Sequence, residues 1–93
     1  EKSYFSQELR ELLENILIYD IKKDSKENLY IATFGKGLVR YNLKTKKIRK
    51  FVRPRLVTNI VKSIAIDAKD NLLIGGLGGA STLEFNQNQK VQY

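Results

Sequence analysis

The feature that most constrains the fold of this chain is an internal repeat. Residues 24–33 read DSKENLYIAT, and residues 67–76 read DAKDNLLIGG. The same offset aligns further apolar and glycine positions on both sides of these segments: Ile18 with Val61, Ile21 with Ile64, Ile31 with Ile74, and Gly35 with Gly78. A period of about 40–45 residues predicts two equivalent structural units rather than one irregular core.

Each unit is expected to form four short strands. The first strand of each is rich in β-branched residues and apolar on both faces, as in a strand that is buried on both sides. A turn follows at DSKEN or DAKDN, where Asp can accept backbone N–H groups and Asn tolerates left-handed dihedral angles. A glycine-bearing turn then separates the second strand from the third. The expected strands cover residues 16–21, 29–33, 38–42 and 47–51 in the first unit, and 60–66, 72–76, 82–86 and 90–93 in the second.

Four antiparallel strands per period of this length are typical of one blade of a β-propeller. We therefore predict an all-β chain, a β-propeller fragment of about two four-stranded antiparallel blades. Residues 16–51 form the first blade, and residues 52–93 form a connection and the second blade. Residues 1–15 hold the end of a preceding blade, at Tyr4 and Phe5, and a connecting segment.

The connecting segment predicts a short helical turn near the N-terminus. Its sequence, SQELRELLENI over residues 6–16, places leucines at helical spacing behind Ser6, a residue type that favours the N-cap. We expect this helix to have a structural role and to cover the connection between blades. A helix that binds a partner is the alternative.

The repeats resemble the two-component regulator propeller family. The matching segments are DSKENLYIATFGKGLVRYN, residues 24–42, and NIVKSIAIDAKDNLLIGGLGGASTLEFN, residues 59–86. That family builds the periplasmic sensor regions of bacterial hybrid two-component systems, which also carry a membrane span and a histidine kinase. The resemblance implies that this chain is a piece of a periplasmic ectodomain of an inner-membrane protein. It also implies that the sensed ligand is an oligosaccharide and that the kinase lies in another part of the protein.

The composition argues against several function classes. The chain has no cysteine and no histidine, so it lacks the groups used by thiolate and imidazole metal sites and by nucleophile–histidine pairs. GGLGG, residues 75–79, lacks the Lys-Ser/Thr ending of a phosphate-binding loop. DSKEN lacks the later Gly and Glu of a calcium loop. We expect no enzyme active site, no metal and no cofactor in this chain.

The chain is basic, with 17 lysines and arginines against 10 acidic residues and a net charge of +7. A basic surface can meet nucleic acid, an anionic membrane or an acidic polysaccharide, or it can simply keep the chain soluble. The densest basic stretch, KTKKIRKF over residues 44–51, is explained by a hairpin and an edge strand, where lysine discourages aggregation. We therefore expect no direct nucleic-acid binding by this segment.

A candidate ligand site lies on the loops at one end of the blades. In propellers, the connections from the fourth strand to the first and from the second strand to the third share one face, and binding groups favour such loops. Arginine can bind carboxylate or sulfate in bidentate fashion, so an acidic oligosaccharide would suit this face. Arg53 and Arg55, on either side of Pro54, are the strongest candidates, although solvated loop cations are the alternative. The loops are residues 6–15, 33–37, 52–59 and 76–80, and the candidate residues are Phe34, Lys36, Arg53, Arg55 and Asn59.

Two function classes remain. The first is a ligand-sensing propeller segment of a transmembrane receptor. The second is a non-sensing scaffold that binds protein or nucleic acid through its basic surface. In both, two blades fall short of the roughly 4–8 that close a propeller. The faces that carry Ile18, Ile31, Val39 and Tyr41 would then meet water, so we expect the isolated chain to self-associate where the remaining blades are missing.

Overall fold

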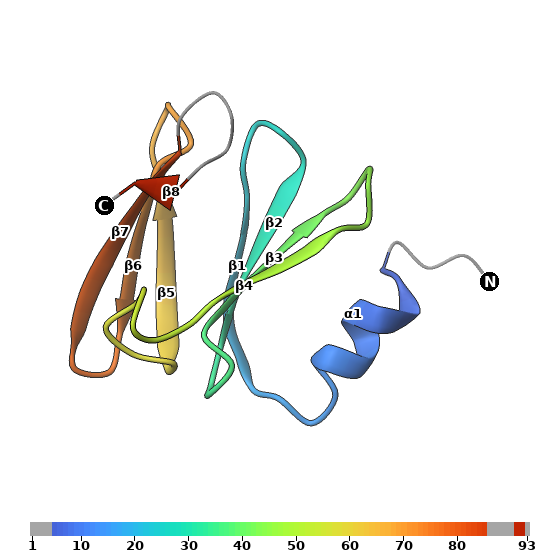
Figure 1. Cartoon of the computed structure of the whole chain (residues 1–93), viewed down its shortest axis with the longest axis horizontal. Coiled ribbons are helices and arrows are strands. Elements are labelled where there is room, and N and C mark those ends of the chain that lie inside the picture. The colour runs from blue at the N-terminus through green and yellow to red at the C-terminus, as the bar shows by residue number, and fades with distance from the viewer. Residues whose placement is uncertain (1–4, 86–90, 93) are drawn as a thin grey trace.

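The computed structural model describes residues 5–85 and 91–92. Within these residues one short helix, α1 (Gln7–Leu12), precedes two antiparallel sheets that stand side by side (Figure 1). The predicted all-β chain is confirmed, and the arrangement is consistent with two propeller blades. The first sheet contains β1 (Ile18–Lys23), β2 (Asn28–Thr33), β3 (Leu38–Asn42) and β4 (Ile48–Phe51), and the second contains β5 (Val61–Ile66), β6 (Leu72–Gly76), β7 (Gly79–Phe85) and β8 (Val91–Gln92), each in chain order.

The turns that follow β1 and β5 preserve the repeat in their hydrogen bonds. In each turn the first Asp accepts the N–H groups of the residues two and four positions later, as expected. These bonds join Asp24 to Lys26 and Asn28 at 2.8 and 2.9 Å, and Asp67 to Lys69 and Asn71 at 2.8 and 2.9 Å. The left-handed residue is Glu27 or Asp70, with φ of 66° and 67°, rather than the Asn that was expected. The left-handed position of each turn therefore falls one residue earlier than predicted.

The first strand of each unit is less buried than its apolar sequence predicted. β1 begins at Ile18 rather than at residue 16, and Ile18 and Ile21 are 42% and 46% exposed. β1 lies at the edge of its sheet and is hydrogen-bonded within that sheet only to β2. β5, the edge strand of the second sheet, buries only Val61 and Ile64, which are three residues apart because of the register shift between Val61 and Ser63. The expectation of strands buried on both faces is therefore wrong.

The connection between β6 and β7 is a tighter hairpin than the expected turn over residues 77–80. Leu77 and Gly78 form a two-residue loop, and Gly78 adopts a φ of 91° that glycine accommodates without strain. β7 consequently begins at Gly79 instead of residue 82. The expected fourth strand over 90–93 corresponds to β8. Tyr4, residues 86–90 and residue 93 lie outside the described part of the chain.

The two sheets pack against each other through a continuous apolar core. Alternate residues of β2 and β3 point toward the second sheet, which contributes residues from β5, β6 and β7. Leu56, in the connection between the sheets, fills the same core and anchors that connection. The buried members are Tyr30, Ala32, Leu38, Phe51, Leu56, Val61, Ile64, Leu72, Ile74 and Leu83.

Helix α1 covers the opposite face of the first sheet. Leu9, only 1% exposed, packs on Ile31, Val39 and Tyr41. Ser6 is the N-cap, as predicted, since its Oγ accepts the N–H of Leu9 at 3.2 Å, and its own N–H donates to the Tyr41 hydroxyl at 2.9 Å. Figure 1 shows α1 on the side of the first sheet that faces away from the second. The helix therefore covers a sheet face rather than the connection between the sheets.

This placement corrects the expected set of water-exposed faces. Ile31, Val39 and Tyr41 are fully buried because α1 shields them. Of the four residues named, Ile18 remains exposed. Leu73 of β6, on the far side of the second sheet, is a further open apolar position and is 52% exposed.

Polar contacts also join the two sheets, in addition to the apolar core. The Asp20 carboxylate on β1 accepts the backbone N–H of Ile64 on β5 at 3.0 Å. The two Asp turns are also joined, because Ser25 donates both its N–H and its hydroxyl to the Asp70 carboxylate. Side-chain oxygens of one sheet thus satisfy backbone and side-chain donors of the other.

The cover provided by α1 can be tested with matched leucine truncations. A helix of six residues is too short to be stable alone, so its contribution comes from packing. Leu9→Ala should lower the free energy of unfolding by about 2–4 kcal/mol, and Leu73→Ala, at an exposed site, by less than about 1 kcal/mol. Urea unfolding followed by circular dichroism measures both. Equal effects of the two substitutions would contradict the buried position of Leu9.

The link between Asp20 and Ile64 predicts a dependence of stability on pH. The Ile64 N–H, with help from the Lys22 ammonium group, lowers the pKa of Asp20 below its ordinary value. A depressed folded-state pKa contributes stability above the unfolded pKa, and this contribution disappears as the pH falls through the folded pKa, below about pH 4. Asp20→Asn should therefore lose less stability than the unsubstituted chain on acidification. Urea midpoints at neutral and acidic pH test this, with the exposed Glu14→Gln as the control; an unchanged acid response in Asp20→Asn would refute it.

Candidate functional site

Three loops meet at one end of the two sheets, the lower end in Figure 1. They are residues 33–37 after β2, residues 52–60 between the sheets, and residues 77–78 after β6. The Asn59 carbonyl accepts the N–H groups of Gly35 and Gly37, each at 2.9 Å, and the Ile60 carbonyl accepts that of Leu77 at 3.1 Å. We call this end the loop face. The backbone thus joins the segments that the propeller argument grouped, except the one that contains α1.

Residues 6–15 were expected on this face, but α1 packs on a face of the first sheet, and only the segment that follows α1 runs along the lower end in Figure 1. Their helix turns away from the loop face because Leu9, Leu12 and Leu13 pack on the first sheet. Leu17, which follows this segment, joins the loop face, because its carbonyl accepts the N–H of Phe34 at 3.0 Å.

The loop face carries a rim of exposed apolar side chains. The rings of Tyr19 and Phe34 lie 6.2 Å apart between centroids, tilted by 53°. Phe34 is 48% exposed, and its backbone is held in place by a β-bridge to Ile60. Aromatic rings held this way offer apolar faces to a ligand without losing much conformational freedom. The other exposed members are Leu17, Val52, Val57 and Leu77.

The five predicted site residues all lie on the loop face, in different situations. Phe34 belongs to the aromatic pair. Lys36, Arg53 and Arg55 are exposed on the loops after β2 and between the sheets. Asn59 has a structural task, since its Oδ1 accepts the N–H of Arg53 at 2.8 Å and its carbonyl holds the neighbouring loop. The loop face therefore combines an aromatic pair with three cations, and Asn59 positions the loops.

Close backbone packing shapes the loop between β2 and β3. Gly37 adopts a φ of 73°, and a Cβ at this position would lie 2.2 Å from the carbonyl oxygen of Phe51. Thr33, fully buried, donates its hydroxyl to the Gly37 carbonyl at 2.7 Å and accepts the N–H of Lys36 at 3.1 Å. The loop that presents Phe34 is therefore rigid on its inner side.

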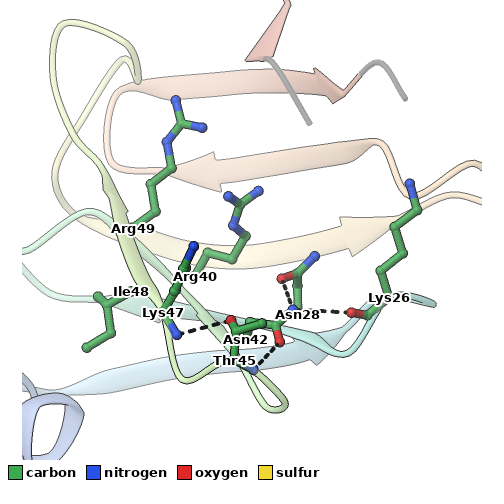
Figure 2. A pocket seen from close by; sticks show the side chains of 8 residues that line it. All are labelled: Lys26, Asn28, Arg40, Asn42, Thr45, Lys47, Ile48 and Arg49. Atoms are coloured by element: carbon green, nitrogen blue, oxygen red, sulfur yellow. Dashed lines mark hydrogen bonds between the residues drawn. The ribbon is translucent and has the colours of Figure 1, made fainter. Parts of the chain in front are cut away.

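A second candidate site lies at the other end of the first sheet (Figure 2). We call it the basic hollow; its volume is about 500 Å³. Figure 2 shows the side chains of Lys26, Arg40 and Arg49 extending to the same side. No carboxylate is among the described residues that line it, which are Lys26, Asn28, Arg40, Asn42, Thr45, Lys47, Ile48 and Arg49.

Hydrogen bonds between amides form the floor of the basic hollow. The Asn42 Nδ2 donates to Asn28 Oδ1 at 2.9 Å and to the Lys26 carbonyl at 3.3 Å. The Asn42 Oδ1 accepts the N–H groups of Lys44 and Thr45, each at 2.9 Å, and so fixes the hairpin that follows β3. The side chains that line the basic hollow are therefore positioned by a network of hydrogen bonds.

Tyr30 lies beside the basic hollow, within the core between the sheets. Burial raises the pKa of Tyr30 to about 12; the Asp24 carboxylate adds to this rise and Arg40 opposes it. The phenol is therefore protonated throughout the physiological range and carries no negative charge that would balance the cations of the basic hollow.

The sequence argument did not identify the basic hollow. Its residues come from three separate segments, 26–28, 40–42 and 45–49, and KTKKIRKF was explained by a hairpin and an edge strand. The signal that could have found it is the alternation of side chains between the two faces of a strand. Once Tyr41 is paired with Ile48, this alternation places Arg40 and Arg49 together on the other face of the sheet. The structure adds no metal candidate, since the described residues contain no group of three or more Asp or Glu side chains suited to an ion. Among those residues, no helix has the length and apolarity needed to cross a membrane.

Comparison with known proteins finds a similarity to a histidine kinase. The chain is 28% identical over 91 residues to Histidine kinase P4 of Formosa agariphila, an alignment that covers 92% of this chain and 7% of that protein. The chain thus spans a small fraction of the length of this relative. No family model matches the chain.

Proposed function

We propose that this chain is a segment of the extracytoplasmic sensor propeller of a hybrid two-component histidine kinase, and that its loop face receives an oligosaccharide. The observation that carries the proposal is the similarity to a histidine kinase along nearly the whole chain. Two consecutive four-stranded sheets with the same strand order support the propeller part of the proposal. In this proposal the segment lies in the periplasm, the kinase domain lies elsewhere in the protein, and the segment itself is not an enzyme.

The chemistry of the loop face supports a sugar ligand. The Tyr19–Phe34 pair offers apolar ring faces, and Lys36, Arg53 and Arg55 are exposed cations on the loops of the same face. Such a set suits a sugar that carries carboxylate or sulfate groups. Occupancy of a face to which both sheets contribute would bias how the blades pack, which gives binding a route to the rest of a receptor.

The ligand proposal can be tested by substituting the exposed aromatic ring. Full-length protein applied to a glycan array should bind a subset of oligosaccharides, and Phe34→Ala should weaken that binding about tenfold or more. Phe5→Ala is the matched control, because Phe5 is also exposed but packs against Tyr41, away from the loop face. Glycan binding that is unaffected by Phe34→Ala would refute this site. Steep, salt-dependent DNA binding without glycan binding would favour the scaffold alternative.

We also propose that the isolated chain self-associates, through the outer face of the second sheet. That face has a shallow hollow of about 410 Å³ lined in part by Ala65, Leu73 and Thr82. In the first sheet α1 occupies the face that would otherwise accept this surface, so head-to-tail stacking is blocked and two copies would pair through the same face. In the complete protein the next blade would cover it.

Light scattering at micromolar concentration tests the self-association. The chain should have the mass of a dimer, and Leu73→Lys should have the mass of a monomer because it places a charge in the contact. The control is Lys62→Gln, at an exposed position of the neighbouring strand β5 that does not line the hollow. A folded monomer for the unsubstituted chain would contradict the proposal.

A further inference from the structure

We propose that the loop face docks on a lipid bilayer with anionic headgroups, so that its exposed apolar side chains enter the boundary between headgroups and acyl chains. A sugar ligand would use the Tyr19–Phe34 pair and the cations of this face, but it would leave the exposed aliphatic side chains in water. A bilayer accounts for both sets. The inference shares the loop face with the oligosaccharide proposal but does not rest on it, and the two ligands would be alternative occupants of the surface around Phe34.

Aliphatic side chains are exposed at three separate points of the loop face. Leu17 precedes β1, Val57 lies in the connection between the sheets, and Leu77 forms the hairpin after β6 together with Gly78. The exposed fractions of these three residues are 65%, 48% and 58%. Single exposed apolar residues are ordinary, but a set gathered at one end of a molecule marks a surface that meets an apolar environment. The loop face therefore has an aliphatic component that aromatic stacking does not use.

The backbone donors of these exposed residues are already bonded within the protein. The N–H of Leu77 donates to the Ile60 carbonyl at 3.1 Å, and the N–H of Val57 donates to the Ser81 Oγ at 3.0 Å. A donor that leaves water for an apolar environment without a partner costs free energy, so loops whose donors are satisfied internally can approach acyl chains at a low cost. This arrangement favours a bilayer, which offers few hydrogen-bond partners below its headgroups.

Cations accompany the apolar side chains along the loops. Each exposed cation lies within two residues of an exposed apolar residue, in the pairs Phe34 with Lys36, Val52 with Arg53, and Val57 with Arg55. A long basic side chain can keep its charge among headgroups while its apolar neighbour enters more deeply. Residues 33–37, 52–60 and 77–78 contain no acidic residue. The Asp20 carboxylate, one position after Tyr19, is bound by Lys22 and the Ile64 N–H. Anionic lipid is therefore the bilayer chemistry that these loops fit.

Sedimentation of the complete 93-residue chain with lipid vesicles measures the interaction. Vesicles of phosphatidylglycerol and phosphatidylcholine in equal parts should bind the chain about tenfold or more tightly than vesicles of phosphatidylcholine alone, because several cations contribute. Equal binding to the two kinds of vesicle, or binding to neither, would overturn the proposal. The vesicles carry no sugar, so a failure here and a failure of glycan binding are separate results.

Substitutions at exposed positions distinguish the loop face from the rest of the basic surface. Leu77→Ser should weaken binding to the anionic vesicles about tenfold, and Arg55→Gln about fivefold. The matched controls are Ile21→Ser, at a position of β1 that is 46% exposed, and Arg10→Gln on α1. Each control should change the affinity by less than about twofold, because both positions lie outside the loop face. Controls that weaken binding as much as the loop-face variants would overturn the proposal.

Fluorescence shows whether the loop face enters the bilayer or only lies near it. The chain has no tryptophan, so Leu77→Trp introduces a single indole reporter. Its emission should move to shorter wavelength and be quenched by brominated lipid when anionic vesicles are added, because indole favours the bilayer interface. Ile21→Trp, the control, should keep the emission that it has in water.

Two results of this measurement would overturn the proposal. In the first, the two tryptophan variants respond alike to the vesicles, which would indicate general attraction of a basic chain. In the second, the emission of Leu77→Trp moves when the protein concentration is raised without vesicles, which would place a second copy of the chain on the loop face.

Discussion

The structure depends on the burial of both faces of the first sheet. One face carries Tyr30, Leu38 and Phe51 and is covered by the second sheet, while the other carries Ile31, Val39 and Tyr41 and is covered by α1. A strand period of two places apolar side chains on both sides when successive residues are apolar, and each side then needs its own cover. The result is three layers, with the first sheet in the middle. The helix is as much a part of this arrangement as the second sheet, although it is only six residues long.

Equivalent positions of the two units consequently have different surroundings. Ile31 and its repeat partner Ile74 are both buried, one against α1 and the other against the first sheet. Tyr30 is buried between the sheets, whereas its partner Leu73 is 52% exposed, because none of the residues that the structure describes forms a layer on the far side of the second sheet. The layers therefore follow the order of the chain. The face that carries Ile31 packs on α1, and the equivalent face that carries Ile74 packs on the first sheet. α1 takes the first place in that series.

This arrangement separates two surfaces of different chemistry. The loop face gathers exposed rings and cations where backbone hydrogen bonds tie three loops together. The basic hollow lies at the opposite ends of β2 and β3. Its lysines and arginines lie beside the hydrogen-bonded amides of Asn28 and Asn42, and Arg49 contacts the Phe51 ring. The inter-sheet core connects the two surfaces, and the Asp20–Ile64 bond adds a polar link between the sheets. A ligand at either end would act on the same packed unit.

The sequence by itself determined the repeat, the eight strands, the two Asp turns and the capped helix. These features depend on residues within a few positions of each other, as when Asp24 accepts the N–H of Asn28 or Ser6 that of Leu9. It also located the loops that meet at the loop face, because equivalent connections of a repeat fall at equivalent places. The structure alone decided which layer covers each face, that α1 leaves the loop face, and that Arg40 lies opposite Arg49. Those outcomes depend on hairpin register and on packing between distant segments, which local sequence patterns do not encode.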